Sequence, residues 1–242
     1  MKRYDFHSHL GKTRSGDANS AAQLVEDLKA FGISKVGICS LSGNGVRAQN
    51  DLVYEAMCEF PEVIEGYADI DPKAPDAIDE VHRTLGECHM NGVKFMPWKH
   101  GYAAENCPSL GGVLDAIGEY GVHVQIHGGA SPLCPPFVWI EHAKKRPHMK
   151  FVFTHICGRE FGHACIEAIK NLDNFWVETS ANMEADILQE AVDVLGSKRI
   201  LFGTDWPYKP TNIEIQKLYH LGLDEDELED VFWRNAQFLW ER

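Results

Sequence analysis

The sequence predicts a single (β/α)₈ barrel, in which eight parallel strands alternate with helices and close into a ring. Short apolar, β-branched runs recur about every 25–30 residues, and each is short enough for a strand that is buried on both faces. Apolar residues at helical spacing fill most of the intervals between these runs. The length of 242 residues is that of one such barrel. We therefore expect one domain, residues 1–242.

The runs set the order of the expected elements. We expect strands at residues 3–9, 35–40, 64–70, 92–96, 123–127, 150–155, 175–179 and 200–204. Helices are expected at residues 20–31, 48–60, 74–90, 110–120, 137–145, 161–171 and 183–195. A last helix, residues 225–240, has one apolar face and is expected to pack against the barrel wall. The rival fold is an open doubly wound sheet, but no GxGxxG motif follows the first strand.

The amino-acid composition excludes several classes of binding partner and structural site. The formal net charge of -13 argues against nucleic acid or an anionic membrane as the main partner, because both select for basic patches. Seven cysteines at irregular spacing, with no CxxC pair, predict neither a disulfide framework nor a structural zinc site. The N-terminus has no signal-peptide pattern, and no apolar run reaches transmembrane length. We expect a cytoplasmic enzyme with a small-molecule substrate, and a homodimer is an open alternative.

Imidazoles and a carboxylate fall at the ends of the predicted strands, where barrel enzymes carry their catalytic residues. The first strand ends with His7 and His9, which are two residues apart and therefore point to the same side. His127 and His155 end the fifth and sixth strands, and Asp205 directly follows the eighth. Nitrogen ligands, one carboxylate and an open position suit zinc, and also manganese, iron or cobalt. We predict a divalent-metal site formed by His7, His9, His127 and Asp205.

Each of these residues also has an ordinary structural interpretation. A His-x-His pair can lie on the surface, and His127 or His155 can be a hydrogen-bonded core histidine. Asp205 can cap a turn ahead of Pro207. Their coincidence at separate strand ends favours a shared site. We expect one Zn²⁺, with Mn²⁺, Fe²⁺ or a second metal as alternatives, to lower the pKa of bound water to about 7.

The chain resembles the amidohydrolase superfamily in five segments, DFHSHL, GVKF, QIHGG, THICG and FGTDWP. The branch most similar to it is the amidohydrolase 2 family, which includes aminocarboxymuconate-semialdehyde decarboxylase and related decarboxylases and hydrolases. The resemblance covers nearly the whole chain. It implies that His7, His9, His127 and Asp205 are the ligands of a mononuclear site. It also implies that His155 acts on substrate or water, so that Asp205 and His155 are the catalytic residues.

Lys94 and three other residues are candidates for substrate binding. Binuclear relatives carry a carboxylated lysine on the fourth strand, where GVKF places Lys94; we favour a plain lysine that binds an anionic substrate. Arg14 and Arg159 lie in loops expected at the barrel mouth and could attract a carboxylate, although surface ion pairs are the ordinary role of each arginine. Trp206 could form a wall for a planar substrate or simply pack the rim.

Three enzymatic functions fit this site. The leading hypothesis is a hydrolase that attacks a small amide, lactone or ester with metal-activated water. The alternative is non-oxidative decarboxylation of the aminocarboxymuconate-semialdehyde decarboxylase type. A phosphodiesterase or DNase fits less well, because such enzymes tend to carry a glutamate where this chain has Lys94, and because the net charge is acidic. A barrel without catalytic activity is the remaining hypothesis.

Overall fold

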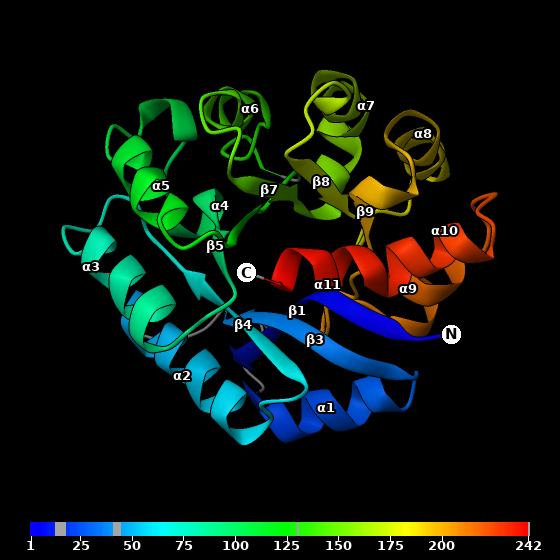
Figure 1. Cartoon of the computed structure of the whole chain (residues 1–242), viewed down its shortest axis with the longest axis horizontal. Coiled ribbons are helices and arrows are strands. Elements are labelled where there is room, and N and C mark those ends of the chain that lie inside the picture. Colours follow the sequence, from blue (N-terminus) through cyan, green and yellow to red (C-terminus); the bar gives the residue numbers. More distant parts are fainter. Residues whose placement is uncertain (13–17, 41–44, 130, 242) are drawn as a thin grey trace.

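The computed structural model describes residues 1–12, 18–40, 45–129 and 131–241, which form a parallel barrel surrounded by helices (Figure 1). The sheet order is β2-β1-β3-β4-β5-β6-β7-β8-β9, and every pair is parallel except β1 with β2. The strands are β1 (Arg3–Lys12), β2 (Ala18–Asn19), β3 (Ile33–Ser40), β4 (Ile64–Asp69), β5 (Gly92–Phe95), β6 (His123–Ile126), β7 (Lys150–Phe153), β8 (Phe175–Glu178) and β9 (Ile200–Leu201). The predicted (β/α)₈ fold is confirmed.

The ring closes between β1 and the segment that follows β9. Phe6 N donates to Phe202 O at 2.9 Å, and Asp205 N donates to His7 O at 2.8 Å. The buried carboxylate of Asp5 supports this seam, since it accepts hydrogen bonds from Thr204 N at 3.0 Å and from the Ser8 hydroxyl at 2.7 Å. Burial raises the pKa of Asp5 to about 6, against the effect of these hydrogen bonds. The closure sets His7 and Asp205 side by side.

Helices surround the ring, and the last of them crosses its opening (Figure 1). They are α1 (Ala21–Lys29), α2 (Val46–Glu59), α3 (Ala77–His82), α4 (Pro97–His100), α5 (Leu110–Gly118), α6 (Phe137–Lys144), α7 (Gly158–Ile169), α8 (Ala185–Leu195), α9 (Thr211–Leu218), α10 (Glu225–Glu229) and α11 (Asn235–Trp240). A π-helical turn, Arg83–Glu87, continues α3, and another, Asp230–Arg234, joins α10 to α11. The sequence predicted neither β2 nor the helices α4 and α9. None of the helices in the described ranges is long and apolar enough to cross a bilayer.

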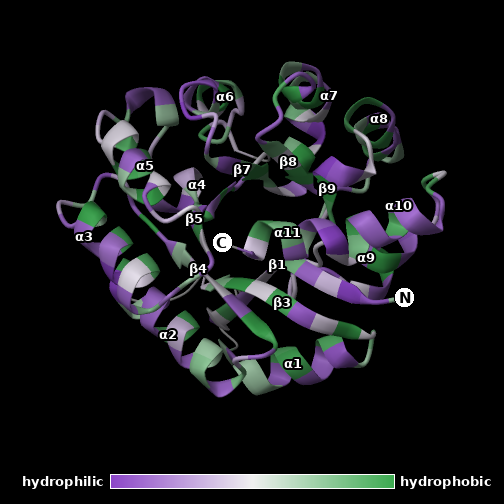
Figure 2. Cartoon of the chain, in the orientation of Figure 1, coloured by the Kyte–Doolittle hydropathy of each residue, from purple (hydrophilic) through white to green (hydrophobic). Residues whose placement is uncertain are grey.

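Strand residues alternate between two cores, as the pleat of a strand requires. On β8, Phe175 belongs to the core between the barrel and the helices, whereas Trp176 belongs to the core inside the barrel. Helix residues such as Leu24 and Val53 complete the outer core. Figure 2 shows hydrophilic and hydrophobic residues interspersed along the helices. All seven cysteines are free thiols.

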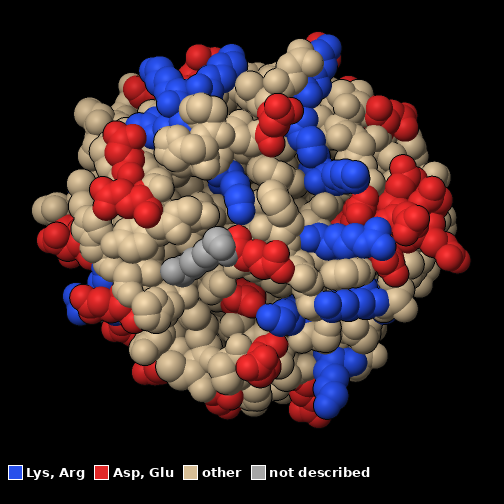
Figure 3. Space-filling view, in the orientation of Figure 1, with Lys and Arg blue, Asp and Glu red and all other residues tan. Residues whose placement is uncertain are grey.

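The C-terminal helix corrects one prediction. Val231 and Phe232 pack into the outer core as expected, but α11 crosses the barrel opening and does not stay on the wall (Figure 1). The Trp240 ring stacks on Phe6 with centroids 5.6 Å apart, and its Nε1 donates to the Tyr67 hydroxyl at 2.8 Å. The apolar rings at this end of the barrel need a cover, which the last turn supplies. Around this end, basic and acidic side chains intermingle (Figure 3).

A buried histidine at the same end predicts acid sensitivity. The His123 ring lies between Phe6 and Tyr67, with each centroid 4.8 Å away, and burial lowers its pKa from 6.5 to about 3. The unfolded chain binds this proton more readily, so stability is lost as the pH falls from 6.5 towards 3. The full contribution to the free energy of unfolding is about 5 kcal/mol. Urea unfolding at pH 7, 5.5 and 4 measures this effect. In His123→Gln, the free energy of unfolding should fall less between pH 7 and pH 4 than it does in the wild type. His220→Gln, an exposed control, should keep the wild-type loss, and an unchanged loss in His123→Gln would contradict this account.

Candidate metal centre and active site

His7 and His9 enter the site together from the carboxyl end of β1. Their spacing of two residues puts both side chains on one face of the strand. Both residues are buried, and their ring centroids are 4.6 Å apart. Burial, together with the charge of Lys94, lowers the pKa of His7 well below its ordinary value, so the ring is neutral. A neutral imidazole is the form that binds a metal.

Asp205 reaches these imidazoles from the segment after β9. Its Oδ1 lies 3.1 Å from His9 Nε2 and 3.6 Å from His7 Nε2. Burial would raise the pKa of Asp205, but the hydrogen bond to His9 and the nearby positive charges hold it below its ordinary value. The residue has φ 54°, a left-handed conformation that strains a side chain other than glycine. Such strain is common where a side chain is held for function.

These atoms fit a metal ion. Metal–ligand bonds of about 2.0–2.1 Å at tetrahedral angles place neighbouring ligand atoms about 3.3 Å apart, close to the spacing of Asp205 Oδ1 from the two imidazoles. Both ring nitrogens of His7 are buried and have no hydrogen-bond partner in the described part of the chain. An unpartnered buried polar group costs about 1–3 kcal/mol. A cation bound by His7, His9 and Asp205 would remove that cost.

His127 and His155 extend the cluster across the barrel. His127 directly follows β6, and its backbone N donates to Phe95 O at 2.9 Å. The ring centroids of His127 and His155 are 5.0 Å apart, and those of His155 and His7 are 5.3 Å apart. The imidazoles therefore form a continuous group from His9 to His127. The Trp98 ring lies 5.8 Å from His127 and walls that side of the group.

The turn that carries His155 is strained and held from several directions. His155, Ile156 and Cys157 have φ of 60°, 43° and 57° in succession. His155 Nδ1 donates to the Ser180 carbonyl at 2.9 Å, and Asn182 Nδ2 donates to His155 O at 3.0 Å. Because Nδ1 carries the proton of that bond, Nε2 is the nitrogen that can accept one. Burial lowers the pKa of His155 to about 4, so the ring is neutral near pH 7.

Glu178, a site residue that sequence reasoning missed, lies beneath this turn on β8. Its carboxylate accepts hydrogen bonds from Ser180 N, from the Ser180 hydroxyl at 2.9 Å and from His155 N at 3.4 Å. It is fully buried, and burial raises its pKa to about 8. One potential ligand atom each from His7, His155 and Glu178 lies within 4.8 Å of the others. The only sequence signal was a glutamate that ends the apolar run FWVE.

Lys94 lies inside the barrel, on β5. The residue is fully buried, and Nζ donates to Thr154 Oγ1 at 3.4 Å. Burial lowers its pKa to about 8, although neighbouring acidic groups, including Cys39 and Glu178, oppose the shift. A solvated surface lysine is therefore excluded, and Lys94 places its amino group inside the barrel. Its uncarboxylated state stays a prediction.

Two other predicted substrate contacts, Arg159 and Trp206, are not brought into the cluster. The Arg159 side chain is 81% exposed, with Nε 3.9 Å from Glu184 Oε1, so it belongs to the surface. The Trp206 indole is buried against α1, where Nε1 donates to Asp27 Oδ2 at 3.2 Å. Each of these two side chains has its polar partner outside the imidazole cluster. Arg14 lies outside the described residues.

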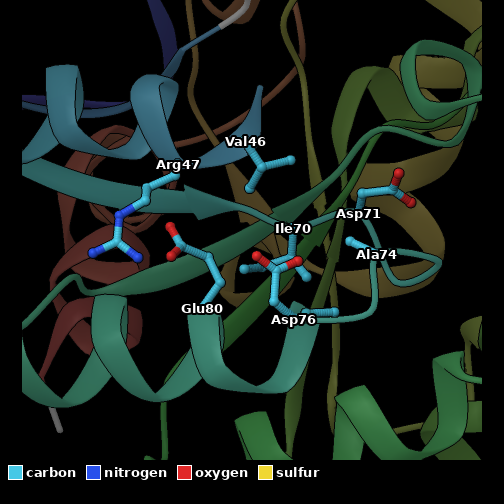
Figure 4. Close-up of a pocket in the computed structure, with 8 residues that line it drawn as sticks. Val46, Arg47, Ile70, Asp71, Ala74, Asp76 and Glu80 are labelled. Carbon is cyan, nitrogen blue, oxygen red and sulfur yellow. The ribbon is translucent and has the colours of Figure 1, made fainter. Parts of the chain in front are cut away.

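A separate hollow lies between α2 and α3 (Figure 4). Its lining consists of Val46, Arg47, Ile70, Asp71, Ala74, Asp76, Ala77 and Glu80. Glu80 is already engaged, since it accepts hydrogen bonds from Asn50 Nδ2 at 2.8 Å and from Arg83 Nη2 at 2.7 Å. The hollow contains none of the clustered imidazoles, and the candidate chemistry stays with the barrel.

Comparisons with known proteins show the family to which the chain belongs. The family model described as "Amidohydrolase" matches residues 17–242. The γ-resorcylate decarboxylase of Polaromonas sp. (strain JS666 / ATCC BAA-500) is 32% identical over 68 residues. That alignment covers 28% of this chain and 21% of the relative, so it spans about a fifth of the relative's length.

Solved structures share the fold at low sequence identity. A 2,6-dihydroxybenzoate decarboxylase from Rhizobium has a TM-score of 0.79 at 15% identity, covering 99% of this chain and 98% of that one. A dihydroxybenzoic acid decarboxylase from Polaromonas sp. JS666, with bound manganese and 2-nitroresorcinol, has a TM-score of 0.76 at 16% identity, covering 99% and 96%. A probable 2-pyrone-4,6-dicarboxylic acid hydrolase from Acinetobacter baumannii, with citric acid bound, has a TM-score of 0.78 at 16% identity, covering 99% of both chains. Since the family model extends over most of the sequence, this protein belongs to the amidohydrolase 2 family of (β/α)₈-barrel enzymes.

Proposed function

We propose that this chain is a divalent-metal-dependent decarboxylase that removes carbon dioxide, without oxidation, from a small planar carboxylic acid. The sequence favoured a hydrolase and kept decarboxylation as the alternative. The relatives support the alternative better, because the curated match and several structural neighbours are decarboxylases of aromatic acids. A neighbour described as a hydrolase keeps the original hypothesis as a second candidate.

The metal ligands we propose are His7, His9, His127 and Asp205. The measured spacing around Asp205 Oδ1 and the unpartnered His7 nitrogens support three of the four. When bound, a divalent ion neutralises and orients oxygen atoms of an anionic substrate. Imidazole nitrogen and carboxylate oxygen suit both Zn²⁺ and Mn²⁺. The structural neighbour that carries manganese supports testing Mn²⁺ beside the Zn²⁺ that the sequence suggested.

The observation that carries the proposal is the fixed orientation of His155. Its Nδ1–H is held by the Ser180 carbonyl, which leaves Nε2 to hold and deliver a proton next to the proposed metal ligands. In the reaction the bond between carbon and carboxylate breaks, its electron pair stays on the carbon, and carbon dioxide leaves. His155 Nε2, which carries no proton in the neutral ring, takes a proton from solvent and passes it to that carbon. The ionised Asp205 stabilises the imidazolium that forms in between, and the ring ends neutral again.

Buried groups nearby favour an anionic, flat substrate. Lys94 offers a positive charge inside the barrel, where weak screening strengthens its attraction for a carboxylate or phenolate. The rings of Trp98 and His127 lie against each other at one side and suit contact with a planar ring. Substrate affinity should therefore depend on both charge and planarity.

Product analysis tests the proposal. Protein freed of metal and reloaded with Mn²⁺ or Zn²⁺ is incubated with hydroxybenzoates that carry a hydroxyl next to the carboxyl group, 2,6-dihydroxybenzoate first. We expect carbon dioxide and the corresponding phenol in equal amounts, and none from His155→Asn. The 2-pyrone-4,6-dicarboxylate lactone is assayed in parallel. Ring opening of that lactone, with no carbon dioxide from any acid, would instead support the hydrolase.

A further inference from the structure

A buried thiol contacts the far side of the His9 ring. Cys39, near the carboxyl end of β3, has no exposed surface, and its Sγ lies 3.2 Å from His9 Nδ1. The opposite ring nitrogen, Nε2, faces Asp205 at 3.1 Å. Parallel pairing of β1 with β3 sets His9 directly beside Cys39 in the sheet register. The contact is therefore built into the barrel and does not depend on a loop.

We propose that Cys39 is a positioning residue for the metal centre, whose sulfur accepts the Nδ1–H of His9 and so fixes the tautomer in which Nε2 is free to bind the ion. An imidazole binds a metal only through an unprotonated nitrogen, so the ring proton of a neutral His9 ligand must sit on Nδ1. In this position sulfur is the acceptor available to that proton.

A second observation points to the same ion. His7 is fully buried, neither of its ring nitrogens has a hydrogen-bond partner within the described ranges, and its ring lies 4.6 Å from His9. With His9 Nδ1 engaged by sulfur, the side of the ring that remains for the ion is the side shared with His7 and Asp205.

The sulfur sets this site apart from the usual arrangement. Metal-binding histidines ordinarily donate their second N–H to a carboxylate, a backbone carbonyl or water, and loss of that partner typically costs 10–100-fold in metal affinity. Sulfur is a weaker acceptor than a carboxylate oxygen. Cys39 therefore fixes the orientation of His9 without adding a strong negative charge behind the ring. The inference rests on the metal centre proposed above, but not on the choice between decarboxylation and hydrolysis.

Metal affinity separates this role from simple packing. Dissociation constants for Zn²⁺ and Mn²⁺ are measured by chelator competition on the wild type, Cys39→Ala, Cys39→Ser and Cys88→Ala. Cys39→Ala should bind about 10–100-fold more weakly, whereas Cys39→Ser keeps an acceptor and should stay within about threefold of the wild type. Cys88→Ala is the matched control, because Cys88 is also a buried sulfur that accepts an N–H, from Arg83 at 3.6 Å, outside the site.

A direct readout protects the test from folding defects. Long-range ¹H–¹⁵N NMR spectra of the zinc-loaded wild type should show His9 with its proton on Nδ1. A proton on Nε2 overturns the inference, as does a Cys39→Ala variant with wild-type affinity or a serine variant as weak as the alanine variant. Failure of the wild type to bind either metal overturns both this inference and the proposed metal centre. Binding that does not depend on Cys39 overturns this inference alone.

Discussion

Replacement of Asp205 by asparagine should lower metal affinity at least about 100-fold, more than the loss of an outer partner. Turnover should fall about 1,000-fold or more, because the same carboxylate assists proton transfer through His155, which itself contributes about 10²–10⁴-fold. Asparagine keeps the size of the side chain but removes the charge that faces His7 and His9 at 3.6 and 3.1 Å. Metal content after dialysis and initial rates at saturating substrate measure the two effects.

Metal content and thermal midpoint, measured together, distinguish a metal ligand from a residue that only stabilises the fold. Asp193→Asn, on the exposed face of α8, is the control and should retain wild-type metal content and rate. Asp205→Asn should stay folded in the metal-free form with only a slightly lower thermal midpoint, since asparagine fills the same volume and tolerates the left-handed backbone but loses the charge that faces His9. If metal content stayed at the wild-type level in Asp205→Asn, the ligand assignment would be wrong.

The convergence of distant residues was predictable because of strand direction. The carboxyl ends of parallel strands meet at one rim, so a histidine at the end of a strand can be placed without knowledge of the packing. His7, His9 and His155 share a cluster for this reason, with ring centroids 4.6 and 5.3 Å apart. The same rule placed Asp205, whose position depends only on the segment that pairs with β1.

Other features depend on contacts that the pattern of residues does not contain. Trp206 follows Asp205 directly, yet its indole donates a hydrogen bond to Asp27 on α1 and does not line the barrel mouth. Glu178 and Cys39 lie within buried strands, where the identity of a residue does not reveal which neighbour it meets across the barrel. Helix α9 follows Pro210, and its apolar residues show only modest helical periodicity, so this helix could not be predicted from the residue pattern. Tertiary contacts decide where these side chains lie.

The position of the His155 ring depends on a network of hydrogen bonds around Glu178. The carboxylate bonds both Ser180 groups and the His155 backbone N–H, while the Ser180 carbonyl holds the ring. From α9, Lys217 donates to the Asn182 carbonyl at 3.0 Å and fixes the other end of the same loop. Three successive left-handed residues persist only if such contacts outweigh their strain. Glu178 is therefore expected to act on the reaction through His155.

Glu178→Gln should lower kcat about 100-fold, near the lower limit of what a positioned acid–base group contributes, and leave KM and metal affinity within a few fold of the wild type. Whichever of the two oxygen positions the glutamine amide nitrogen takes, the backbone N–H of either Ser180 or His155 loses its acceptor, so the His155 turn would lose a hydrogen bond. Steady-state kinetics and metal titration on the same preparation give the three numbers. Glu80→Gln, a buried carboxylate bonded to Asn50 and Arg83 away from the imidazoles, serves as the control. A matching fall in metal affinity would show that Glu178 binds the ion itself, because a residue that acts only through His155 has no means of weakening the contacts at His7 and Asp205.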